Sequence, residues 1–63
     1  MEATMQVWTI TELLHMTREQ LCELRCDIER MLNGLKAGTV ARGNALTSLE
    51  NIRRVMLRKG FHP

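Results

Sequence analysis

The sequence predicts an all-α protein built on an antiparallel helical hairpin with a short N-terminal extension. Two apolar stripes carry this prediction, because their residues recur at steps of three and four, which places side chains on one face of a helix. A break at residues 34–38, which contains two glycines, separates the stripes. The stripes are Leu21, Leu24, Ile28, Met31 and Leu35 before the break, and Ala45, Leu49, Ile52 and Met56 after it.

The chain is one small domain of 63 residues. A chain of this size buries only about 60% of the surface that it exposes when unfolded, and its core rarely supplies more than about 5 kcal/mol. Cys22 and Cys26 are one helical turn apart, a geometry that suits an intrachain disulfide poorly, so we expect reduced thiols. Self-association as a homodimer or larger helical bundle is therefore expected to complete the core.

The N-terminal residues 1–8 show no helical periodicity, and we expect an extended or flexible tail that lays Trp8 on the helices. A single short strand is the alternative, because Met5, Val7 and Thr9 alternate with Gln6, Trp8 and Ile10. A short helix is expected at about residues 10–15. Thr9 and Glu12 fit the capping-box pattern, in which each side chain accepts from the other residue's backbone N–H.

The next helix is expected at about residues 18–37, because Thr17 and Gln20 fit a second capping box. Two capping boxes so close together favour two segments with a bend near residues 16–17, and one continuous helix is the alternative. Gly34 and Gly38 both suit the end of this helix, since glycine readily adopts the left-handed conformation of a C-terminal cap. Gly38 fits better, because the apolar stripe continues past Gly34.

The last helix is expected at about residues 40–59. Its start is open between residues 40 and 45. Thr39 is a candidate cap for the earlier start, whereas Gly43-Asn44 is a further break and Thr47 and Glu50 fit another capping box. Gly60 suits the position after the helix, where a left-handed residue ends many helices. Phe61 is then expected to fold back onto the last turn.

The apolar arc of the last helix is wide, at roughly 160° on a helical wheel, because Leu46 and Leu57 extend it. A helix this apolar usually contacts more than one neighbour, which favours an interface with a second copy or another protein. The alternative is that the N-terminal segment covers the excess within one chain, through Trp8, Leu13 and Leu14. The candidate interface consists of Leu46, Leu49, Ile52, Val55, Met56 and Leu57.

The net charge is +2, but its distribution is uneven. Residues 1–35 contain three basic and six acidic residues, whereas residues 36–63 contain six basic residues and one acidic residue. One explanation is that an acidic helix pairs with a basic one and that both suit the helix dipoles. The other is a basic surface for nucleic acid or an acidic protein. Its candidate contacts are Arg53, Arg54, Arg58 and Lys59.

Catalysis, cofactors and metals are not expected. The chain shows no nucleophile–base arrangement and no phosphate loop, and His15, Cys22 and Cys26 match no zinc spacing. No apolar run approaches the roughly 18 residues of a membrane span. We therefore expect a small cytoplasmic adaptor or regulator that binds itself and an unidentified protein, with a nucleic-acid-binding regulator as the alternative.

Overall fold

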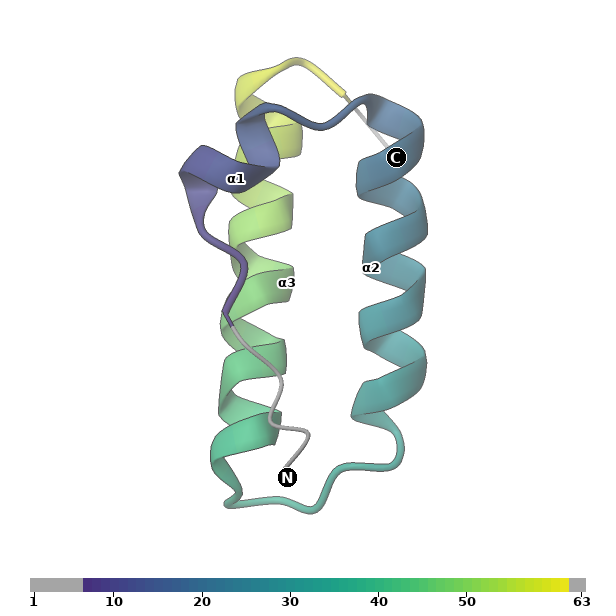
Figure 1. The fold of residues 1–63 in the computed structure, drawn as a ribbon, viewed down its shortest axis with the longest axis vertical. Coiled ribbons are helices and arrows are strands. Elements are labelled where there is room, and N and C mark those ends of the chain that lie inside the picture. The colour runs from purple at the N-terminus through teal and green to yellow at the C-terminus, as the bar shows by residue number, and fades with distance from the viewer. Residues whose placement is uncertain (1–6, 62–63) are drawn as a thin grey trace.

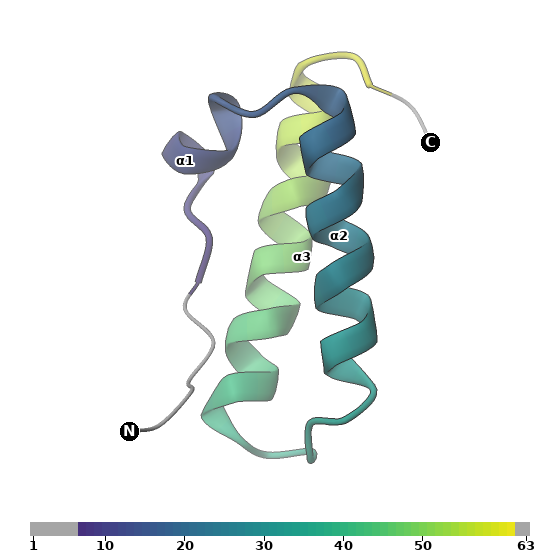
Figure 2. The same ribbon diagram turned by 45° about the vertical axis from the view of Figure 1, so that its right-hand side comes forward.

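The computed structural model describes residues 7–61, which form three helices and no strand, so the all-α prediction is confirmed. The helices are α1 (Ile10–Leu14), α2 (Arg18–Leu32) and α3 (Val40–Arg58). In Figure 1, α2 and α3 lie side by side and run in opposite directions. Figure 2 shows α1 next to α3, on the side away from α2. None of these helices combines the length and apolar character that a membrane crossing requires.

Both predicted capping boxes are confirmed, and they divide the N-terminal half into two helices. At α1, the Glu12 backbone N–H donates to Thr9 Oγ1 at 3.2 Å, and the Thr9 N–H donates to Glu12 Oε1 at 3.0 Å. Thr17 and Gln20 repeat the arrangement at α2, at 3.1 and 2.9 Å. Residues 1–6 of the predicted tail lie outside the described residues.

α2 ends at Leu32, before the predicted end at residue 37. The chain continues in tight turns, in which the Gly34 N–H donates to the Met31 carbonyl and the Leu35 N–H donates to the Leu32 carbonyl. The Arg42 guanidinium donates to the carbonyls of Leu32 and Leu35, at 3.3 and 3.2 Å. Carbonyls at a helix end lack helical partners, so this long-range contact stabilises the early end of α2.

α3 begins at Val40, the earlier of its two predicted starts, because the Thr39 hydroxyl accepts from the Arg42 N–H at 3.2 Å. At the other end, Gly60 has a φ of +76°. The Phe61 N–H donates to the Met56 carbonyl at 2.7 Å, and the Gly60 N–H donates to the Leu57 carbonyl at 3.2 Å. These two bonds form a Schellman motif, which folds Phe61 back onto the core as predicted.

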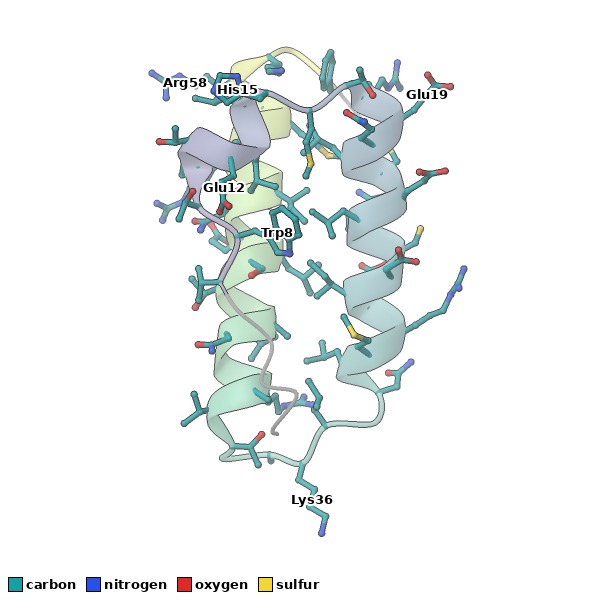
Figure 3. The ribbon with its side chains drawn as sticks, viewed as in Figure 1. Trp8, Glu12, His15, Glu19, Lys36 and Arg58 are labelled. Atoms are coloured by element: carbon teal, nitrogen blue, oxygen red, sulfur yellow. The ribbon has the colours of Figure 1, made fainter. Side chains whose placement is uncertain are left out.

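The core receives side chains from all three helices. α1 contributes one fully buried residue, Leu13, and α1 packs against α3. Trp8 also packs against the core, and Figure 3 shows its side chain directed toward the region between α3 and α2. The N-terminal segment therefore covers part of the wide apolar arc of α3 within one chain. The buried apolar residues are Leu13, Leu21, Ile28, Ala45, Ile52, Val55 and Met56.

Candidate protein-binding face

The residues of α3 that face α2 form a row along the helix. Buried or apolar side chains also lie on each side of this row. On one side lie Ser48 and Val55, which are seven residues apart and both fully buried. The Trp8 N–H donates to Ser48 Oγ, so the N-terminal segment covers this side. On the other side lie Leu46 and Leu57, which are 48% and 53% exposed. The described chain therefore covers one side of the α2–α3 pair and leaves the other open.

The open side contains a groove of about 600 Å³ between the two long helices, which we name the α2–α3 groove. Leu49 and the buried Met56 belong to its apolar lining, and Leu46, Leu57 and Phe61 extend this surface toward solvent. The lining residues are Arg25 and Glu29 of α2, Leu46, Leu49, Glu50, Arg53, Met56 and Leu57 of α3, and Phe61.

Only part of the predicted interface is available to a partner. Leu46, Leu49, Met56 and Leu57 line the α2–α3 groove. Ile52 and Val55, the other two predicted interface residues, are fully buried within the single chain and do not line the groove. The physical reason is that α2 and the N-terminal segment already cover the faces of α3 that carry them.

The charges that line the groove are balanced, with one arginine and one glutamate from each helix. On α3, Glu50 pairs with Arg53 at 3.7 Å and with Arg54 at 3.4 Å, all within one helix. On α2, Arg25 Nε is buried and has no hydrogen-bond acceptor in the described part of the chain. Glu29 is exposed. The groove thus has ion pairs within α3 and, on α2, a buried Nε–H without an acceptor.

The structure does not gather the four predicted nucleic-acid contacts into one patch. Arg53 lines the groove, whereas Arg54 lies about 100° further round the helix. Arg58 projects outward at the end of α3 near α1 (Figure 3). Lys59 Nζ donates to the Met16 carbonyl at 3.1 Å and lies 5.8 Å from the centre of the Phe61 ring. Lys59 therefore has a structural role at the turn between α1 and α2.

Cys22 and Cys26 are free thiols on α2, the first half-buried and the second exposed. They line a shallow hollow together with Glu23, Asp27 and Arg30. Within residues 7–61, no three histidine, cysteine, aspartate or glutamate side chains come together as a metal site would require.

Sequence reasoning missed four groove residues, namely Arg25, Glu29, Glu50 and Phe61. A signal for the first two exists, because each follows a residue of the apolar stripe and so borders it on the helical wheel. Long charged side chains at such positions commonly flank a helix contact. Phe61 enters the groove because the Schellman motif turns the chain back at Gly60.

Comparisons with known proteins return no relative of this chain. No protein-family model matches the sequence, no curated protein matches it, and no solved structure matches the fold. The candidate site is accordingly defined by the residues of this chain alone, as an apolar groove of balanced charge between two helices.

Proposed function

We propose that this protein is a small non-enzymatic adaptor or regulator that binds proteins through helix-to-helix contact and acts as a homodimer. The observation that carries the proposal is the open α2–α3 groove with Leu46 and Leu57 about half exposed beside it. Two antiparallel helices with a covering segment on one side leave the opposite side for a further helix, as in a four-helix bundle.

Burial of the exposed leucines provides a driving force for this association. Fully burying a leucine side chain contributes about 2 kcal/mol relative to full exposure, so the exposed halves of Leu46 and Leu57 contribute about 1 kcal/mol each. A symmetric dimer buries each of them twice. A chain of 63 residues has a small core of its own, so this gain is a substantial fraction of its stability.

The chemistry of the groove suits binding rather than catalysis. Its polar groups are two arginines and two glutamates, and no histidine, cysteine or hydroxyl side chain lines it. Nucleophilic catalysis requires a nucleophile within hydrogen-bonding reach of a base. The two free thiols elsewhere on α2 suit a reducing compartment, which supports a cytoplasmic location.

The alternative, a nucleic-acid-binding regulator, has weaker support. It depends on Arg53, Arg54, Arg58 and Lys59, but Glu50 pairs with the first two and Lys59 bonds to the Met16 carbonyl. Phosphate binding requires several cations directed toward one strand or groove. Binding of a nucleic acid that weakens steeply with salt and is lost in Arg54→Ala/Arg58→Ala would favour the alternative.

Substitutions in the groove test the proposal. Leu46→Asp and Leu57→Asp each place a carboxylate where a partner helix would lie, and we expect either to weaken self-association by about tenfold or more. Val40→Asp is the matched control, because Val40 is 71% exposed on α3 but lies outside the groove. Circular dichroism should show all three variants helical. Equal association of the groove variants and the control would count against the proposal.

A further inference from the structure

We infer that two copies of this chain meet across the α2–α3 groove about a two-fold axis, so that Arg25 of each copy pairs with Glu29 of the other. The inference deepens the proposed function and rests on it, because it specifies which residues the second copy adds to the site. It starts from two charges on α2 that lack partners, and from the arrangement of the leucines on α3.

Arg25 and Glu29 are the groove charges that have no ion-pair partner within residues 7–61. Arg25 Nε is buried without an acceptor, and neither side chain takes part in an ion pair within residues 7–61. They are four residues apart on one helix, but with the cation first, the less favourable order for pairing within a helix. The Arg25 side chain is only partly buried, but a buried N–H without an acceptor is unfavourable, so an acid supplied from outside the chain would satisfy its Nε.

A two-fold axis satisfies both charges at once. When the same α2 helix crosses in the opposite direction, the Arg25 position of one copy faces the Glu29 position of the other. The two-fold then repeats the contact, because every contact in such an interface occurs twice with the roles exchanged. One symmetry operation therefore yields two ion pairs from one unpaired cation and one acid.

The exposed leucines of α3 obey the same symmetry. Leu46 and Leu57 are eleven residues apart, which separates them by roughly 16 Å along the helix. A two-fold that reverses the helix direction brings the end of the groove with Leu46 over the end with Leu57 of the second copy. The half-exposed leucines of both copies thus lie in the same interface as the charged residues.

The charge of the groove favours a second copy over other occupants. Its two arginines and two glutamates sum to zero, so it offers no net attraction to a phosphate backbone or to a strongly acidic peptide. A different protein would need an acid and a base at matching spacing on an apolar helix. A second copy carries that pattern by identity.

Charge reversal tests this pairing directly. Arg25→Glu places two glutamates opposite each other in each contact of its homodimer, and Glu29→Arg places two arginines there. We expect each variant alone to dimerise about tenfold more weakly than the wild type. An equimolar mixture of the two should recover dimerisation, because each contact of the mixed dimer then joins a glutamate to an arginine. Native mass spectrometry distinguishes the mixed dimer when one variant carries an isotope label.

The controls lie on the same helix outside the groove. Arg30→Glu and Glu23→Arg make the same charge changes at exposed positions of α2 and should leave dimerisation unchanged. The pairing would be supported if the mixture recovers dimerisation and both control variants dimerise as the wild type does.

The outcomes also separate this inference from the proposed function. If Leu46→Asp dissociates the dimer but the two charge variants do not recover on mixing, the groove is an interface and the Arg25–Glu29 pairing is wrong. If Leu46→Asp has no effect on association, the proposed function itself fails, together with the pairing that rests on it.

Discussion

The backbone N–H of Trp8 donates a hydrogen bond to Oγ of Ser48, 3.0 Å away and forty residues later in the chain. One turn further along α3, Asn51 Nδ2 donates to the Trp8 carbonyl at 2.9 Å. Both backbone groups of one extended residue are thereby satisfied by side chains of α3. Because Ser48 is fully buried, this contact fixes the N-terminal segment to α3 and closes one side of the helix pair.

Ser48→Ala should weaken the contact between the N-terminal segment and α3. The substitution leaves the Trp8 N–H without its acceptor in a partly buried position, and we expect a loss of about 1–2 kcal/mol in the free energy of unfolding. Urea denaturation followed by the fluorescence of Trp8, the single tryptophan, measures it. Thr47→Ala is the control, because Thr47 is exposed at the neighbouring position of α3 and this substitution should change the free energy of unfolding little. An unchanged midpoint in Ser48→Ala would show that the contact does not stabilise the fold.

Leu13→Ala should show that α1 belongs to the core. Leu13 is the fully buried residue of α1, and truncating a buried leucine costs about 2–5 kcal/mol. Met31→Ala, at an exposed position of α2, should cost much less. Thermal unfolding by circular dichroism compares the two variants. A Leu13→Ala variant as stable as Met31→Ala would mean that α1 contributes nothing to the packed structure.

Replacing either of two glycines by alanine should change the stability of the protein, and the two changes should have opposite signs. Gly43 lies within α3 with open space around its Cα, so Gly43→Ala should stabilise the protein by about 0.5–1 kcal/mol through helix propensity. Gly60 also has open space but a φ of +76°, so Gly60→Ala should destabilise it by about 1 kcal/mol through backbone strain. Chemical denaturation of both variants gives the two signs. A stabilising Gly60→Ala would contradict the left-handed cap.

Glu12 should make stability depend on acid pH. The Thr9 backbone N–H, and then the Thr9 hydroxyl, lower the pKa of Glu12 below its ordinary value of 4.5 by bonding to its carboxylate. The unfolded chain thus takes up this proton at a higher pH than the folded chain does. The contribution of Glu12 to stability is therefore fully present above pH 4.5 and is lost as the pH falls through the lowered folded value.

Glu12→Gln provides the comparison for this pH dependence, because glutamine keeps an acceptor oxygen but does not titrate. The stability difference between wild type and Glu12→Gln should shrink as the pH falls below 4.5. The carboxyl carbon of Glu12, followed by NMR, should titrate with a midpoint below that value. A midpoint at or above 4.5 would exclude the capping contact as the cause.

The sequence allowed the helix starts to be predicted because caps are local. Thr9, Thr17 and Thr39 each lie three residues before the backbone donor that they satisfy, and the structure has all three contacts. Gly60 was predictable for the same reason. The end of α2 was not, because the Arg42 guanidinium that binds the carbonyls of Leu32 and Leu35 comes from the following helix.

The candidate site was predicted only in part, since a helical wheel measures how much of a helix is apolar but not which neighbour covers it. Val55 and Leu57 both widen the apolar arc of α3, yet Val55 is buried within the chain and Leu57 is half exposed. The distinction depends on the contact between Trp8 and Ser48, which places the N-terminal segment on the Val55 side of α3. Such a contact between distant residues has no periodicity that a sequence could reveal.

The molar mass in solution across a dilution series tests the central claim most directly. Sedimentation velocity from about 1 µM to about 100 µM, combined with helicity at each concentration, covers the range expected for a modest interface. Our account predicts a shift from the 7.3 kDa of one chain toward twice that mass as the concentration rises, with Leu46→Asp remaining at the lower value. A fully helical wild-type protein that keeps the mass of one chain at every concentration would contradict it.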